Sequence, residues 1–274
     1  MSLFAREPPP PATPATRRLR ALIAVTALAT VLVDLINLEY AAEGGFGLTV
    51  RTIWALLRAI GFLVLMRTVR LGRMVSRPFG LILAATTVFA SVRLAIPRSG
   101  ALLPPWPVIA AVAVLIVLCG LVVLQLYASP AIATHLTRRP PRRPVPPWVL
   151  TARVAALSYG ALLLVPALVA VGSLFDEPRL PRTLAIPLVL VWLLIAFGVI
   201  SVMPWLGLFV LFDHGWARVL LGIVTVVLLA VQLALCLALL GVDGLVRDGG
   251  PMAVAAGLAA YALWRSRRRR SRPT

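Results

Sequence analysis

Four charged residues interrupt the apolar runs in the first third of the chain, and they are the main candidates for chemistry. Residues 30–44 read TVLVDLINLEYAAEG, so Asp34 and Glu39 lie toward the end of an apolar run. Arg58 and Arg93 lie inside the next two runs. Carboxylates pair with guanidinium groups, and guanidinium groups also bind anions through parallel N–H bonds. We therefore expect either a structural ion-pair cluster or a cavity for an anionic head group or solute. An excess of Arg over Asp34 favours the cavity.

The predicted depths of these charges support a common location. Asp34 lies about eight residues before the outer end of its run, which corresponds to about 12 Å at 1.5 Å per residue. Arg58 follows Arg51 by seven residues, and Arg93 lies in the outer third of the third run. A charge exposed to lipid costs about 2.5–3.5 kcal/mol, so such groups face the inside of a helix bundle and pair there.

A second candidate site is the basic stretch THLTRRPPRRPVPPW at 134–148. It carries Arg138, Arg139, Arg142 and Arg143, and the chain ends in RSRRRRSRPT. Basic residues beside a membrane attract anionic lipid by about 1 kcal/mol each, although the same residues also act as signals for membrane orientation. We expect no nucleic-acid partner, because the Arg residues flank apolar runs and no aromatic residues interleave the C-terminal Arg run.

Catalytic and metal-binding patterns are missing from the sequence. There is no GxSxG, HExxH, Walker A or paired-acid motif. The two histidines, His135 and His214, lie near the predicted cytoplasmic side, and Cys119 and Cys236 lie inside apolar runs without a CxxC motif. We expect no enzymatic activity, no cofactor and no metal site.

The elements that position these residues are predicted to be membrane-spanning helices. The chain has 274 residues and is 61% hydrophobic, whereas soluble domains are about 45–50% apolar. Runs of about 20 apolar residues suit a bilayer-crossing helix. We predict an all-α, polytopic integral membrane helix bundle with about eight spans, at roughly 21–40, 52–66, 79–97, 106–128, 149–174, 183–204, 216–240 and 252–264. The last span is short: either its helix starts near Leu245 or it is re-entrant.

The charge distribution predicts the orientation. All 27 basic residues are Arg, against 9 acidic residues, giving a net charge of +18. A cytoplasmic N-terminus and eight spans place 19 Arg residues inside and 5 outside, as the positive-inside rule requires. Both termini are then cytoplasmic, and we expect a multi-pass protein of the bacterial inner (plasma) membrane. Residues 1–16 read as a disordered Pro-rich tail, 17–264 as the transmembrane domain and 265–274 as a basic tail.

Two functional hypotheses follow. The first is a non-enzymatic membrane component that binds a protein partner or anionic lipid through its basic loops and helix faces. The alternative is a transporter or channel for a small solute or anion that uses the Asp/Arg cluster. A scarcity of charges in the later spans disfavours transport, whereas a solvent-accessible cavity that reaches Arg58 would favour it. Small residues four apart in the last run, such as Ala255 and Ala259, predict close helix packing within the bundle or at a subunit interface of a homo-oligomer.

Overall fold

The computed structural model describes residues 13–40, 46–95, 104–137, 146–175, 178–212 and 214–270, and every regular element within these ranges is a helix. The predicted all-α class is therefore confirmed. In chain order the elements are α1 (Pro14–Glu39), α2 (Phe46–Arg70), α3 (Ser76–Ala95), α4 (Trp106–Ala128), α5 (Pro130–Thr137), α6 (Pro147–Phe175), α7 (Arg182–Leu211), α8 (Gly215–Leu235), the π-helix η1 (Cys236–Leu240), α9 (Gly241–Gly244), the π-helix η2 (Leu245–Gly249) and α10 (Gly250–Arg270).

Six helical segments are long and apolar enough to cross a membrane. They are Pro14–Glu39, Leu48–Arg70, Trp106–Ala128, Pro147–Phe175, Arg182–Leu211 and Gly215–Arg265. Their outward faces are apolar: Leu28 is 70% exposed, Leu194 is 71% exposed and Val226 is 68% exposed. Large apolar surfaces on the outside of a bundle suit lipid and not water. The molecule therefore has the surface of a multi-pass membrane protein.

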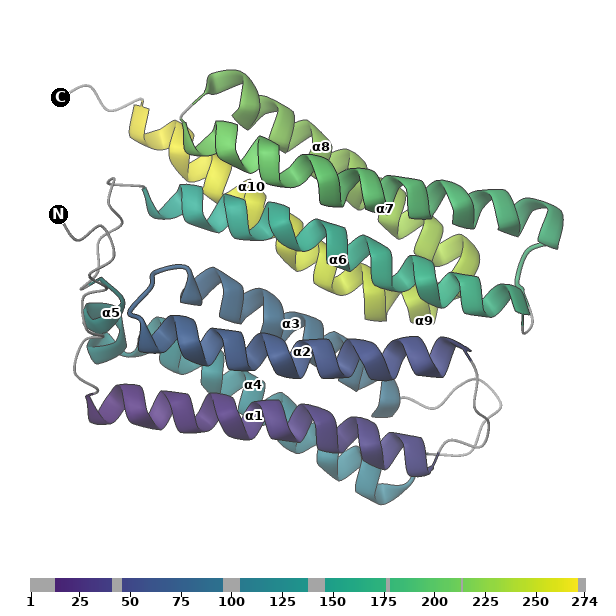
Figure 1. Cartoon of the computed structure of the whole chain (residues 1–274), viewed down its shortest axis with the longest axis horizontal. Coiled ribbons are helices and arrows are strands. Elements are labelled where there is room, and N and C mark those ends of the chain that lie inside the picture. Colours follow the sequence, from purple (N-terminus) through teal and green to yellow (C-terminus); the bar gives the residue numbers. More distant parts are fainter. Residues whose placement is uncertain are drawn as a thin grey trace, which may run out of the picture.

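Successive long helices alternate in direction, so their ends gather at two opposite ends of the molecule (Figure 1). We call the end where α1 begins and α10 finishes the basic end. The Arg residues near helix ends on this side whose side chains are described are Arg17, Arg18, Arg20, Arg67, Arg70, Arg73, Arg77, Arg153, Arg218 and Arg265. At the opposite end, the corresponding residues are Arg51, Arg179 and Arg182.

The long segment Gly215–Arg265 reverses direction in its middle. Gly241 has φ 75° and ψ −167°, a conformation that is essentially restricted to glycine. The guanidinium group of Arg179 lies where a Cβ atom of residue 241 would be placed. After this turn, η2 and α10 run back along α8, so that Leu263 packs near Gly222 (Figure 1). The last apolar run thus belongs to a helical segment that begins near Leu245, which is the first of the two alternatives that the sequence left open.

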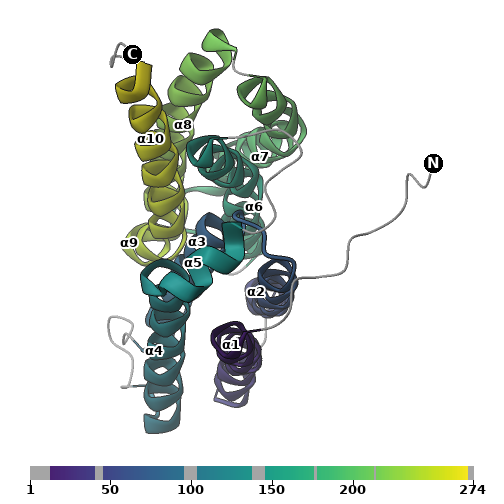
Figure 2. The same cartoon turned by 90° about the vertical axis from the view of Figure 1, so that its left-hand side faces the viewer.

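The helices form two groups, each with its own core (Figure 2). The N-terminal bundle contains α1, α2, α4 and α5, and the C-terminal bundle contains α6, α7, α8 and α10. Helix α3 lies between them: Ile82 belongs to the C-terminal core, whereas Leu83 and Ala84 belong to the N-terminal core. Polar groups on or beside α3 therefore lie at the junction of the two bundles.

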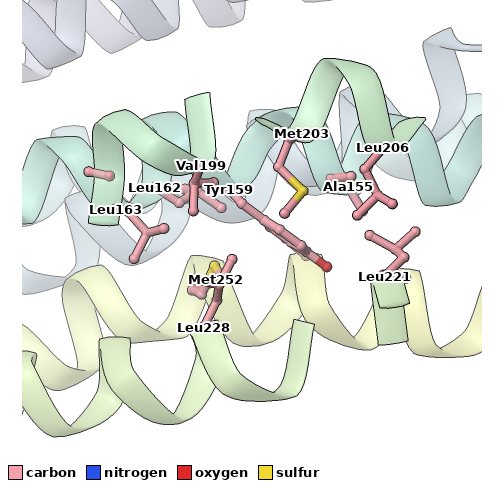
Figure 3. Close-up of a cluster of buried hydrophobic side chains, with 14 of the residues drawn as sticks. Ala155, Tyr159, Leu162, Leu163, Val199, Met203, Leu206, Leu221, Leu228 and Met252 are labelled. Carbon is pink, nitrogen blue, oxygen red and sulfur yellow. The ribbon is translucent and has the colours of Figure 1, made fainter. Parts of the chain in front are cut away.

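The C-terminal core encloses aromatic residues whose polar atoms are paired. Tyr159 is fully buried, lies among Leu162, Met203 and Leu221, and its hydroxyl forms a 3.0 Å hydrogen bond with Thr225 (Figure 3). Such pairing is expected, because an unpaired hydroxyl in an apolar interior is costly.

Small residues on α10 lie both on the face that packs inside the bundle and on the face that points outward. Ala255 and Ala259 are buried in the C-terminal core, as expected for close packing inside the bundle. Gly257 instead faces outward, with nothing within 4 Å of an added Cβ atom.

Candidate polar site between the two bundles

Arg58 is the most deeply buried charged residue among those described. Its side chain extends from α2 toward α3 and is 7% exposed. Nη1 donates one long hydrogen bond of 3.4 Å to the main-chain carbonyl of Thr86, and Nε has no partner. A guanidinium group has five N–H donors and carries its charge at all ordinary pH values, so this group is poorly satisfied.

Asp34 lies on the neighbouring helix α1 and is partly buried. It contacts the Thr52 side chain, and its negative charge interacts with that of Arg58. The two side chains form no direct ion pair within the described part of the chain. The structure thus brings together two of the four predicted cluster residues, but at a separation that leaves the Arg58 donors unfilled.

Of the remaining predicted residues, only the side chain of Glu39 belongs to the part of the chain that the structure describes, and it does not join this pair. Glu39 is exposed at the last position of α1. The side chain of Arg93 lies outside the described residues, as do Arg138, Arg139, Arg142 and Arg143 in full. The segment that carries the last four connects α5 with α6, and α6 begins at the basic end (Figure 1).

A second charged pair, Arg247 and Asp248, lies on η2 in the C-terminal bundle. Nε of Arg247 donates hydrogen bonds of 3.0 and 2.9 Å to Oδ1 and Oδ2 of Asp248, and Nη2 also contacts Oδ2. Each side chain is 12% exposed. The charge count that predicts the orientation places Arg247 outside the membrane, and the structure shows that this residue lies within the π-helical segment η2 and not in a loop. Adjacent opposite charges in GLVRDGG were the available signal.

Two features of the sequence place η2 against α3. Pro251 has no N–H group and cannot donate a helical bond to the carbonyl four residues earlier, which favours the wider π-helical turn before it. Gly250 allows close approach, because an added Cβ atom there would lie 2.5 Å from Cδ1 of Phe89 on α3. Together they bring the Arg247–Asp248 pair to the junction of the bundles.

A cavity of about 20 Å³ lies at this junction. Helices from both bundles line it, with Trp54 on α2, Thr86 and Ala90 on α3, Pro166 on α6, and Arg247 and Asp248 on η2. A cavity needs about 10–15 Å³ to hold one water molecule, so this cavity has room for about one water molecule. Arg58 is not among the lining residues, but it donates to the carbonyl of Thr86, which is, and the charges of Arg247 and Asp248 act on Arg58.

In the part of α6 that lines the cavity, one hydrogen bond of the helix is missing. Pro166 leaves the carbonyl of Leu162 without its helical donor. Nε2 of Gln232 on α8 donates to that carbonyl at 3.2 Å, and Oε1 of Gln232 accepts from Nε1 of Trp192 at 3.1 Å. Interrupted helices inside a membrane are tolerated where neighbours satisfy the freed backbone groups, and they often surround binding sites.

Aromatic residues accompany the Arg residues at the basic end. Arg77 donates to the Leu126 carbonyl at 3.0 Å and lies 5.9 Å from the ring centre of Tyr127. Arg218 lies 4.9 Å from the ring centre of Trp148. Arg265 donates to the Tyr261 hydroxyl at 3.1 Å. Arg and aromatic side chains at a common level are typical of the head-group layer of a membrane.

The described ranges contain no group of three or more His, Cys, Asp and Glu residues that could hold a metal ion. Cys119 and Cys236 are buried and unbridged, in the two separate cores. His135 is buried on α5, and its Nε2 lies 3.0 Å from the Val69 carbonyl, which joins α5 to α2.

No protein-family model matches the chain, and no curated protein or solved structure matches it.

Proposed function

We propose that the chain is an eight-span protein of the bacterial inner membrane with both termini in the cytoplasm. The turn at Gly241 divides the longest apolar segment into two crossings, α8 and η2–α10, and α3 adds a short crossing to the other five helices. The basic end then faces the cytoplasm, because basic residues are retained on that side of a membrane.

In this orientation the protein acts as a non-enzymatic membrane component that binds anionic lipid at its basic end. The observation that supports this function is the arrangement of Arg77, Arg218 and Arg265 against Tyr127, Trp148 and Tyr261. The rings hold the Arg side chains at the head-group level, where each contributes about 1 kcal/mol to the attraction of anionic lipid. Arg138, Arg139, Arg142 and Arg143 follow α5 and precede α6 in the sequence, and we expect them to add to this charge.

The test compares lipid retention by the purified full-length protein in native mass spectrometry. Phosphatidylglycerol should remain bound in preference to phosphatidylcholine. Changing Arg138→Gln and Arg139→Gln together should reduce retention of phosphatidylglycerol by about 1 kcal/mol per Arg. The matched control changes Arg179→Gln and Arg182→Gln, which removes the same charge from the opposite end and should have little effect.

Equal retention of both lipids, or equal losses in the two double variants, would contradict the proposal. Preferential retention that survives all four changes, Arg138, Arg139, Arg142 and Arg143 to Gln, would assign binding to the helix-end Arg residues instead. A copurifying protein displaced by the same four changes would indicate that the basic end binds a protein and not lipid.

A second candidate function is transport of a small solute or anion, and one specific observation favours it. The cavity between the bundles is lined by Arg247 and Asp248 of a π-helical segment and by Thr86, whose carbonyl accepts a hydrogen bond from Arg58. Sites at the junction of two helix bundles can open alternately to the two sides of a membrane. Flux of anions into liposomes that contain the protein, compared with flux into liposomes without protein and with flux for Arg58→Gln, tests this function. Flux no greater than that of protein-free liposomes excludes transport, and equal flux in the wild type and Arg58→Gln excludes a role for Arg58.

A further inference from the structure

We propose that the seam between α6 and α7 at the basic end holds one anionic phospholipid molecule, and that the phosphate group of this lipid pairs with Arg153. The inference rests on the proposed function, in which the basic end lies at the cytoplasmic surface of the membrane and binds anionic lipid. It adds the position of one specific site and the side chain that holds the phosphate.

The first argument is the position of Arg153 along α6. The charge count assigns Arg153 to neither side of the membrane, because the residue lies inside the predicted span at 149–174. In the structure it is the seventh residue of α6, so its Cα atom lies about 9 Å from the start of the helix. The 29 residues of α6 extend over about 43 Å, whereas the hydrocarbon core of a bilayer is about 30 Å thick. When the excess length is shared between the two ends, Arg153 lies near the boundary of the core, where its long side chain reaches the lipid phosphates.

The second argument is that Arg153 has no anionic partner among the described residues. Its side chain is only partly exposed, yet within the ranges that the structure describes its guanidinium group forms no hydrogen bond or ion pair. The described acids, Asp34, Glu39, Asp243 and Asp248, all lie toward the opposite end of the molecule. Charged groups within a membrane are normally paired. The phosphates of the surrounding lipid are the anions at the level of Arg153, so we assign the partner to them.

The third argument is the shape and polarity of the seam. Gly207 on α7 has no side chain, and Cγ of Arg153 lies 3.5 Å from the place that a Cβ atom would take there. The stem of Arg153 thus packs against α7, while its nitrogen atoms are not fully buried and the guanidinium group opens to the surface. Leu157, four residues further along the same face of α6, is 46% exposed. A phosphate beside Arg153 therefore has apolar surface below it for an acyl chain.

The surrounding charge selects the class of lipid. A guanidinium group binds a phosphate through two parallel N–H bonds, and this pairing is available to any phospholipid. A head group that also carries an ammonium, as in phosphatidylcholine, would bring a second positive charge to an end of the molecule that is already rich in Arg. Phosphatidylglycerol has no such charge and is the lipid that we expect in the seam.

The experiment measures lipid retention by the full-length protein in native mass spectrometry, with phosphatidylglycerol and phosphatidylcholine supplied together. The wild type should keep one phosphatidylglycerol molecule at collision energies that remove the others. Arg153→Met, which keeps an apolar stem against Gly207 but removes the charge, should weaken retention of that molecule by about tenfold or more. Arg153→Lys keeps the charge without the planar fork and should retain more lipid than Arg153→Met. Both variants should melt close to the wild type without lipid, because no described partner of Arg153 is lost.

Two controls separate this site from general attraction to the basic end. Arg18→Gln removes one charge from an exposed side chain at the same end and should leave the retained molecule in place. Excess inorganic phosphate should not displace it, because free phosphate has no acyl chain to cover Leu157.

Wild-type retention in Arg153→Met, equal losses in Arg153→Met and Arg153→Lys, a loss of the same size in Arg18→Gln, or displacement by inorganic phosphate would each overturn the inference. If the preference for phosphatidylglycerol still falls when Arg138 and Arg139 are changed to Gln, the proposed function stands without this site. A wild-type protein that shows no preference for phosphatidylglycerol refutes both.

Discussion

Gln232 on α8 donates a 3.2 Å hydrogen bond to the carbonyl of Leu162, four residues before Pro166 on α6. The same side chain accepts a 3.1 Å bond from Trp192 on α7. Gln232 thus replaces the helical hydrogen bond that Pro166 cannot donate to Leu162. It also provides an acceptor for the indole N–H of Trp192. All four residues are buried, so neither the carbonyl nor the indole can turn to water instead.

Gln232→Leu should destabilise the protein, because it leaves the Leu162 carbonyl and the Trp192 N–H unpaired. Hydrogen bonds between membrane helices contribute about 0.6–1.7 kcal/mol each, so we expect a loss of about 1–3 kcal/mol in unfolding by denaturing detergent. Adding Pro166→Ala should recover part of that loss, because an alanine has the backbone N–H group that proline lacks and can donate it to the Leu162 carbonyl within the helix. The control is Ser201→Ala, at an exposed hydroxyl bonded within its own helix; a loss as large as that of Gln232→Leu would refute the argument.

Asp34→Leu should lower the melting temperature measured in detergent, because the charge of Arg58 loses its nearest carboxylate on α1. Breaking a fully buried pair costs about 3–5 kcal/mol, and we expect less here because Asp34 is only partly buried. The double change with Arg58→Leu should restore much of the stability. Glu39→Leu, at an exposed acid on the same helix, should melt like the wild type.

The same Asp34→Leu protein distinguishes a structural ion pair from an anion-binding cluster. If the cluster binds an anion, stabilisation by added phosphate should be stronger in Asp34→Leu than in the wild type, because one repelling carboxylate is removed from the neighbourhood of Arg58. A purely structural ion pair predicts no phosphate dependence of the melting temperature in either protein. If Asp34→Leu melts like the wild type with and without phosphate, Asp34 has no role in the charge cluster.

Gly241→Ala should destabilise the turn between α8 and η2. A non-glycine residue in the conformation of Gly241 costs about 1–3 kcal/mol, and the new Cβ atom would collide with the Arg179 guanidinium group. Thermal unfolding in detergent measures the loss. Gly257→Ala is the matched control: this position is helical, exposed and open, so alanine should be neutral or stabilising by up to about 1 kcal/mol.

Reporter fusions should resolve the number of crossings and the orientation. Fusions after Gly45, Arg142, Glu177 and Thr274 should report outside, inside, outside and inside, and an insertion after Val242 should report outside. An outside signal at Thr274 would mean that η2 and α10 do not cross, which reduces the count to seven. An inside signal after Val242 would show that the Gly241 turn does not reach the outer surface.

The sequence by itself determined the helical class and the approximate helix positions. Lipid and the protein interior both exclude unpaired backbone groups, so long apolar runs such as 106–128 can only become helices, and their limits follow from composition. It also indicated that Arg58 faces the bundle, because an intramembrane guanidinium group exposed to lipid is too costly. Both inferences use local properties of the chain.

Only the tertiary structure decided which polar groups meet. Arg247 and Asp248 lie in a stretch that looks like a loop, and they enter the junction because Gly241 turns the chain and Gly250 allows contact with Phe89. Gln232 finds the freed carbonyl of Leu162 although the two residues are 70 positions apart in the chain. Such pairings depend on how helices of similar apolar composition pack against one another, and hydropathy carries almost no information about that choice.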